Sequence, residues 1–198
     1  MMELRLDNWV PVNVPNSKKG TYVVVRSKMH RGILAFKYAP LVVEVVDTYF
    51  PELSGLTIYL YATYSALGRY HVNAYPYNLA LNPVDLKREP NEYVVHVIAH
   101  ELTHLIQYNY DIFVSLGQEY FPLLYAKRIP KGEEACDLYT YARHPDLVVP
   151  GRGGYIGIPE NADPEEVHEL ALEAIRLRNE EGVRNYIKWF KERLKEVV

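Results

Sequence analysis

Apolar residues recur at two spacings in the first part of the chain, and each spacing predicts a different element. Short runs rich in β-branched and aromatic residues predict strands, which are expected at 21–28, 56–63, 70–74 and 78–81. Residues 32–50 carry apolar side chains at helical spacing instead. Pro40 should kink or split that helix. Residues 1–20 are expected to be irregular, because prolines and a glycine punctuate a polar stretch there.

Helical spacing dominates after residue 89. A Pro-Asn-Glu start signal at 90–92 predicts a helix that runs to about Tyr108. Further helices are expected at 132–143 and, as an amphipathic pair broken near Gly182, within 163–198. The aromatic stretch 109–130 should be partly helical, with Gly117 and Pro122 as breaks.

The strands all lie in the first part of the chain, with one helix among them, and helices make up the rest, which predicts the α+β class. We expect one domain over residues 1–160 and a C-terminal helical extension over 161–198 packed on the same domain. A chain of 198 residues with 48% hydrophobic composition is long enough for one well-filled core.

Composition narrows the partners and the compartment. A formal net charge of −3 gives no electrostatic case for binding nucleic acid or an anionic membrane. The first residues lack the basic head and apolar run of a signal peptide, and apolar runs such as 41–43 are too short to span a membrane. The single cysteine, Cys136, rules out an internal disulfide and suits a reducing cytosol. We therefore expect a cytoplasmic protein, and the scarcity of glutamine and cysteine weakly favours a thermophilic source.

The pentapeptide His100-Glu-Leu-Thr-His104 carries the clearest chemistry in the chain. Residues four apart lie on one face of a helix, so His100 and His104 can direct two imidazoles at one Zn²⁺ ion. Glu101 points elsewhere and can act as general base on a water at that ion. Uncharged neighbours indicate a buried helix. The alternative is a buried helix whose histidines only form hydrogen bonds in the core.

A catalytic zinc site needs a third protein ligand, and the downstream acids supply candidates. Glu133 is favoured and Glu134 comes next, whereas Asp137 and His144 are less favoured. Glu133 and Asp137 are four apart, so Asp137 could accept the ring N–H of a ligand histidine. These acids could instead merely complement a helix dipole.

The two motifs together, His100-Glu-x-x-His104 and Glu133-x-x-x-Asp137, resemble the gluzincins, the thermolysin-like branch of zinc metallopeptidases. The resemblance covers about fifty residues up to Ala142. It implies a zincin-like fold with a small mixed sheet, in which an active-site helix packs against a glutamate-bearing helix. It also implies that the strand before the active-site helix, at 77–81, is an edge strand that could bind an extended peptide.

The expected function is zinc-dependent hydrolysis of peptide bonds, with an endopeptidase favoured over an exopeptidase and a peptide or protein as substrate. His100, His104 and Glu133 would hold the metal, and Glu101 would be the catalytic base. The alternative is a zincin-like protein that acts without proteolysis, as a zinc-binding regulator or interaction module. The sequence does not indicate an oligomeric state.

Several other residues stay open. His96 lies one turn before His100 and is expected to support the site or the core rather than bind the ion. Cys136 is expected to be a small buried residue, not a nucleophile. The donor that stabilises the oxyanion in peptide hydrolysis is not assigned, and its candidates are Tyr139, Tyr141, Arg143, His144 and Tyr155.

Overall fold

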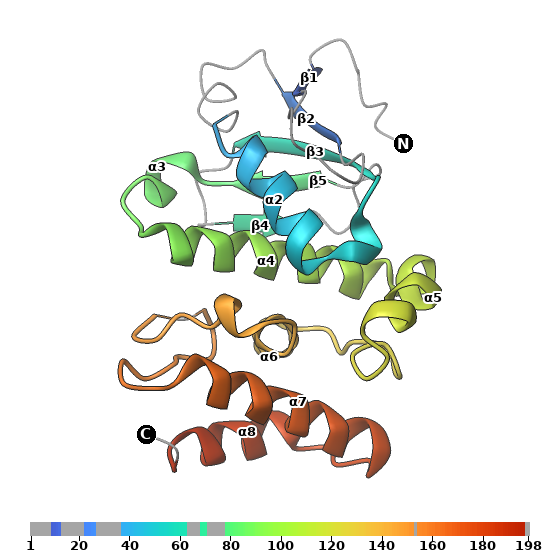
Figure 1. Cartoon of the computed structure of the whole chain (residues 1–198), viewed down its shortest axis with the longest axis vertical. Coiled ribbons are helices and arrows are strands. Elements are labelled where there is room, and N and C mark those ends of the chain that lie inside the picture. Colours follow the sequence, from blue (N-terminus) through green and yellow to red (C-terminus); the bar gives the residue numbers. More distant parts are fainter. Residues whose placement is uncertain are drawn as a thin grey trace. The chain divides into compact units, whose positions relative to one another are not determined.

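The computed structural model describes residues 9–12, 22–26, 37–62, 68–70, 78–152 and 154–196. The chain divides into two compact units, Met1–Glu89 and Pro90–Val198 (Figure 1). The boundary expected after residue 160 therefore falls inside the second unit, which also holds the C-terminal helices. The first unit contains the strands and the second is built from helices, so the α+β class is confirmed.

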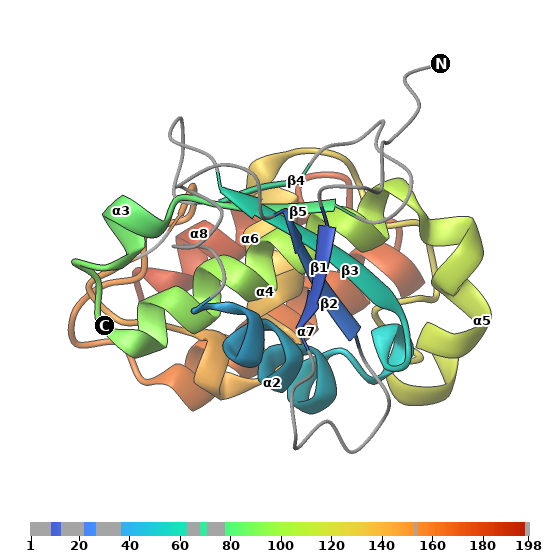
Figure 2. The ribbon, with the colours of Figure 1, turned by 90° about the horizontal axis from the view of Figure 1, so that it is seen from above.

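The first unit is organised on a five-stranded mixed sheet in the order β1-β2-β3-β5-β4 (Figure 2). Its strands are β1 Trp9–Val12, β2 Tyr22–Arg26, β3 Thr57–Ala62, β4 Gly68–Tyr70 and β5 Asn78–Leu81. The central pairs β2–β3 and β3–β5 are parallel, whereas the outer strands β1 and β4 pair antiparallel with their neighbours. The buried side chains of β3 and β5, such as Leu60 and Leu79, supply part of the core.

The predicted strands at 21–28, 56–63 and 78–81 are confirmed as β2, β3 and β5. β1 lies in a stretch that was expected to be irregular, and Pro11 is tolerated there because β1 is an edge strand. Of the strand expected at 70–74, only Tyr70 lies among the described residues, at the end of β4.

The edge-strand assignment at 77–81 is wrong. β5 pairs with β3 on one side and with β4 on the other, so both of its rows of backbone groups face a neighbouring strand. A strand paired on both sides cannot add an extended peptide. Tyr77 itself lies outside the described residues.

Helix α2, Ala39–Tyr49, packs against β2 in the same unit. Pro40 lies in its first turn rather than at a kink, which is the position where a missing N–H costs least. The first part of the helix expected at 32–50 lies outside the described residues, apart from the turn at 37–38. A short helix, α3 Pro83–Leu86, follows β5, and the side chain of Asn82 caps it.

The second unit contains five α-helices among its described residues. They are α4 Asn91–Tyr108, α5 Tyr110–Tyr120, α6 Glu133–Tyr141, α7 Pro164–Glu180 and α8 Tyr186–Leu194. Helix α6 packs between α4 and α7, and α8 packs against α7 (Figure 1). The helices expected at about 90–108, at 132–143 and within 163–198 are therefore confirmed.

One predicted break is wrong. Gly117 lies inside α5 rather than at its end. A Cβ atom at this position would lie 2.3 Å from the ring of Tyr125, so the glycine lets that ring pack directly on the helix. No helix in the described part of the chain combines the length and the apolar composition that crossing a bilayer requires.

Candidate metal centre

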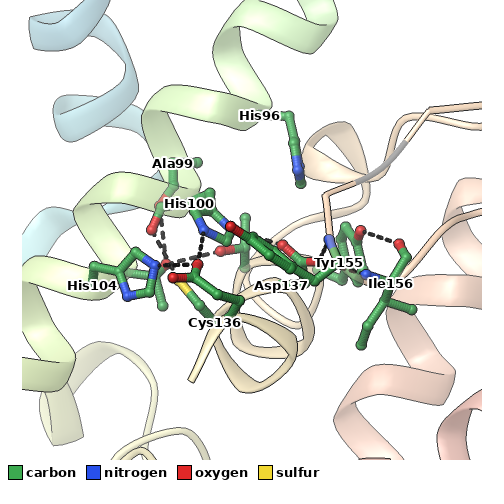
Figure 3. A network of polar contacts seen from close by, with 12 residues as sticks. His96, Ala99, His100, His104, Cys136, Asp137, Tyr155 and Ile156 are labelled. Atoms are coloured by element: carbon green, nitrogen blue, oxygen red, sulfur yellow. Dashed lines mark hydrogen bonds and ion pairs between the residues drawn. The ribbon is translucent and has the colours of Figure 1, made fainter. Parts of the chain in front are cut away.

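Helix α4 presents the imidazoles of His100 and His104 from consecutive turns. Both side chains are buried, and their rings meet edge to face with centroids 4.7 Å apart. Both rings lie on the side of α4 that faces the helix carrying Cys136 and Asp137 (Figure 3). The four-residue spacing therefore places the two rings where the sequence pattern predicts.

Small polar side chains hold α6 close to α4. The thiol of Cys136 donates to the backbone carbonyl of His100 over 3.0 Å. One turn further along both helices, the hydroxyl oxygens of Thr103 and Thr140 lie 2.9 Å apart. Because these side chains are short, the helix backbones can approach closely, and the first turn of α6 comes within reach of the histidines.

Glu133 stands in that first turn and contacts both histidines. Its Oε2 atom lies 3.1 Å from Nε2 of His100 and 2.8 Å from Nε2 of His104. Glu134, the neighbouring candidate, forms an ion pair with Lys191 of α8 instead. The structure therefore brings Glu133, and not Glu134, together with the pair on α4.

The opposite ring nitrogens have their own partners. Nδ1 of His100 lies 2.7 Å from Oδ1 of Asp137, and Nδ1 of His104 lies 2.7 Å from Oε1 of Gln107. An ionised carboxylate and an amide oxygen only accept hydrogen bonds, so both Nδ1 atoms carry protons. In the neutral imidazole the Nε2 atom then holds a lone pair, and both lone pairs point to the side where Glu133 stands.

This donor set fits a small tetrahedral cation. Two ligand atoms held about 2.0–2.1 Å from a tetrahedral zinc are about 3.3 Å apart. The distances of 3.1 and 2.8 Å from Glu133 Oε2 to the two Nε2 atoms are a few tenths of an ångström shorter than that separation. Two lone pairs and a carboxylate oxygen would repel one another at such distances unless protons or a metal ion lay between them.

Without an ion, protons take that place. Burial lowers the pKa of His100, but its neighbours Cys136, Asp137 and Glu133 outweigh burial and leave this pKa well above the usual value. Burial also lowers the pKa of His104, but Cys136 and the carboxylate of Glu101 outweigh burial and raise this pKa to about 9. The hydrogen bond from His100, aided by His104, lowers the pKa of Glu133 to about 2. The site is thus built to hold positive charge.

Within the described part of the chain, two groups of buried side chains could hold a metal ion, and they share His100. One is His100, His104 and Cys136; the other is His96, His100 and Asp137, and in each the ligand atoms lie within 4.8 Å of one another. In the second group, Asp137 already accepts from His100 and from two backbone amides. We favour the first group's histidine pair with Glu133, because Glu133 contacts both Nε2 atoms whereas the Cys136 thiol donates to a carbonyl.

The predicted base, Glu101, is also buried, at 6% exposure. Its negative charge raises the pKa of His104 on α4 and adds to the rise in the pKa of Tyr155. Its carboxylate is therefore electrostatically coupled to residues on both sides of the centre.

Asp137 links the histidine pair to the loop that follows α6. Its side chain is fully buried, and its Oδ2 atom accepts from the backbone N–H groups of Tyr155 at 2.6 Å and Ile156 at 2.7 Å (Figure 3). The hydroxyl of Tyr141 donates to the carbonyl of Ile156 over 3.0 Å. Tyr155 is 61% exposed as a residue, and its ring stacks on that of His100 with centroids 6.2 Å apart.

The other predicted candidates lie in the core or away from the pair. His96 stacks between Tyr93 and Tyr141, and its Nδ1 lies 2.9 Å from the carbonyl of Leu147. His144 caps the turn at Pro145–Leu147. Of the candidate oxyanion donors, Tyr139, Tyr141 and Arg143 are buried, with hydrogen bonds to other parts of the core.

Two contributors were missed at the sequence level. Gln107 lies three residues after His104 and so shares its helix face, a spacing that could have identified it. Gly154 is needed because a Cβ atom there would lie 2.8 Å from Oδ1 of Asp137. No pattern in the chain indicates that approach, since it depends on how the loop folds back on α6.

Comparisons with family models, with curated proteins and with solved structures found no match to this chain.

Proposed function

We propose that this protein is a zinc metallopeptidase that hydrolyses peptide bonds. The observation that carries the proposal is that Oε2 of Glu133 lies within 3.1 Å of Nε2 of both His100 and His104. Two imidazoles and one carboxylate are the protein ligands of a common class of catalytic zinc site, which leaves a fourth position for water or substrate. Glu133 is partly exposed, with 43% of its side chain accessible, which suits a site that a substrate must reach.

A zinc ion held by these residues would supply Lewis acidity, which lowers the pKa of water and polarises a carbonyl group. Glu101 would take a proton at its carboxylate from the attacking water and deliver it to the leaving amine. A site that only stabilised the fold would have no need of a carboxylate in that position. Asp137 and Gln107 keep the two histidines in the Nδ1–H tautomer, which leaves both Nε2 atoms available.

Tyr155 is the residue that we expect to donate a hydrogen bond to the substrate. Partial burial and the carboxylate of Glu133 raise the pKa of its hydroxyl, so the phenol keeps its proton at neutral pH. It is also the one exposed ring stacked on a ligand histidine among the described residues. A neutral phenol at that place can stabilise negative charge on the oxygen of the scissile carbonyl.

The arrangement agrees with a gluzincin-type, zincin-like protein, in which the third ligand comes from a second helix. We propose an endopeptidase that acts on a peptide or protein in the cytoplasm. The two C-terminal helices α7 and α8 would support α6 and so the glutamate ligand.

The test combines metal content with activity. The purified chain should contain close to one zinc per molecule by elemental analysis, and it should cleave a mixture of unstructured peptides. Glu101→Gln should keep the zinc and lose cleavage by at least a hundredfold, the size of a general-base contribution. Stoichiometric zinc without any cleavage in the unaltered chain would favour a zinc-binding regulator. A chain that takes up no zinc after reconstitution would exclude both the peptidase and the zinc-binding regulator.

A further inference from the structure

Gln107 touches two separate parts of the metal centre. Its Oε1 atom lies 2.7 Å from Nδ1 of His104. Its Nε2 atom donates to the carbonyl of Pro130 over 2.9 Å and to the carbonyl of Gly132 over 3.3 Å. The side chain is almost completely buried, at 1% exposure. The nitrogen and the oxygen of its amide thus both have partners inside the protein.

These contacts leave one orientation of the amide. The carbonyl oxygens of Pro130 and Gly132 only accept hydrogen bonds, so the NH₂ group has to face them. The amide oxygen therefore faces His104 and fixes the proton of this ring on Nδ1. As a result, the Nε2 atom of His104 is held as the lone-pair donor.

The two carbonyls belong to the segment that leads into α6. Gly132 is the N-cap of α6 and adopts a φ of +112°, which strongly favours glycine. Glu133 follows directly, so the path of 130–132 decides where its carboxylate points. No side-chain hydrogen bond caps α6, and the hydrogen bonds from Gln107 to these two carbonyls anchor the segment.

We propose that Gln107 is a positioning residue that couples one metal ligand, His104, to another, Glu133. The inference rests on the proposed zinc site and adds a residue that acts through its ligands. A glutamate at this position would still accept from His104 but would turn a carboxylate, without N–H donors, toward two carbonyls. A glutamine amide can accept from His104 and donate to the two carbonyls at the same time, which a glutamate of the same length cannot do.

The first experiment measures zinc affinity by competition with a chromophoric chelator. Gln107→Met keeps the volume and removes both contacts, so the dissociation constant should rise tenfold to hundredfold. Gln107→Glu keeps the contact with His104 alone and should recover part of that loss. The matched control is Gln118→Met. Gln118 lies on α5 and donates to the carbonyl of Tyr125, with no contact to the three proposed ligands, so this change should leave zinc affinity unchanged.

The second experiment separates coupling from a merely structural role. Gln107→Met is made again in a Glu133→Gln background, where Glu133 can no longer serve as a full ligand. If Gln107 positions Glu133, the same change should now cost clearly less, by at least threefold. An equal cost in both backgrounds, or an unchanged affinity in Gln107→Met, would overturn the coupling. Because affinity is measured without substrate, a zinc-binding chain that cleaves nothing would count against the proposed hydrolysis while still reporting on Gln107.

Discussion

Oδ2 of Asp137 lies 2.6 Å from the backbone nitrogen of Tyr155, while the other oxygen of the same carboxylate lies 2.7 Å from His100 Nδ1. The buried carboxylate of Asp137 thus orients His100, a candidate metal ligand. It also fixes the path of the loop that carries Tyr155, whose ring stacks on His100. Any change at Asp137 should therefore reach both.

Asp137→Asn should destabilise the fold by about 2 kcal/mol, because the amide NH₂ must face either a histidine N–H or two backbone N–H groups. Zinc affinity should fall tenfold to hundredfold at the same time. Urea unfolding and chelator competition measure the two effects. The matched control is Asp163→Asn, since Asp163 caps α7 and asparagine caps equally well. Equal stability of the two variants would contradict the role given to Asp137.

Gly154→Ala should disturb the same carboxylate from the loop side. Its Cβ would lie 2.8 Å from Oδ1 and 3.0 Å from Oδ2 of Asp137, so loop or carboxylate must shift. We expect a loss of about 1–3 kcal/mol in unfolding free energy. Gly157→Ala offers a control a few residues away, because its Cβ would meet no atom within 4 Å. Equal melting temperatures for the two variants would show that the contact is unimportant.

Glu133→Gln and Glu134→Gln should separate the two adjacent acids. Only Glu133 contacts the histidines, whereas Glu134 pairs with Lys191 at the protein surface. We expect elemental analysis to find little zinc in the Glu133 variant and a full complement in the Glu134 variant. Loss of zinc in both variants would mean that the first turn of α6 matters as a whole rather than through one ligand.

Cys136→Ser tests the alternative third ligand. The thiol lies near both histidines but donates to the carbonyl of His100, a contact that a serine hydroxyl can take over. We expect the variant to retain zinc with an affinity within a few-fold of the unaltered chain. A cobalt-substituted protein that shows a sulfur-to-metal charge-transfer band, absent in the serine variant, would assign the thiolate as a ligand instead.

The zinc-free protein should lose stability as the pH rises from 6.5 to 9. The pKa of His104 is raised from 6.5 to about 9, so its protonated form stabilises the fold fully below pH 6.5, and this stability is lost as the pH rises through 9. The pKa of Glu133 is lowered from 4.5 to about 2, so its contribution is present above pH 4.5 and is lost as the pH falls through 2. The midpoint of urea unfolding, measured at several pH values between 6.5 and 9, reports the loss of stability.

Glu101→Gln provides the comparison for that pH series. It removes a negative charge that raises the pKa of His104, so its urea midpoint should change less between pH 6.5 and 9. Parallel curves for the two proteins would contradict the assigned cause.

Local patterns predicted most of the elements, because apolar periodicity and capping residues act over a few positions. The span of α4 follows from its start signal at 90–92, and that of α7 from Asp163 followed by Pro164. The failures involve contacts between distant residues. Gly117 suggests a helix break when it is judged by local sequence. Its role is to make room for the ring of Tyr125, and a local pattern does not contain that contact. The resemblance predicts an edge strand at 77–81, whereas β5 pairs with β4 as well as β3, and no local pattern gives that sheet order.

The candidate site divides in the same way. The i,i+4 spacing of His100 and His104 follows from helix geometry alone, and the partnership of Asp137 with a ligand histidine was expected from its spacing to Glu133. The sequence alone does not decide between Glu133 and Glu134, because the decision depends on which side of the first turn of α6 faces the histidines. The same holds for Tyr155, whose closeness to His100 depends on a loop that folds back on α6.

His104 and Glu133 are 29 positions apart in the sequence, and they meet at the start of α6. An ion bound to both would close a loop of about 30 residues, which in the chain-entropy model restricts the unfolded chain by about 3–4 kcal/mol. The metal would then act as a reversible cross-link as well as a reagent. A chelator would open that loop without breaking a covalent bond, so the folding equilibrium of the chain would follow the concentration of free metal.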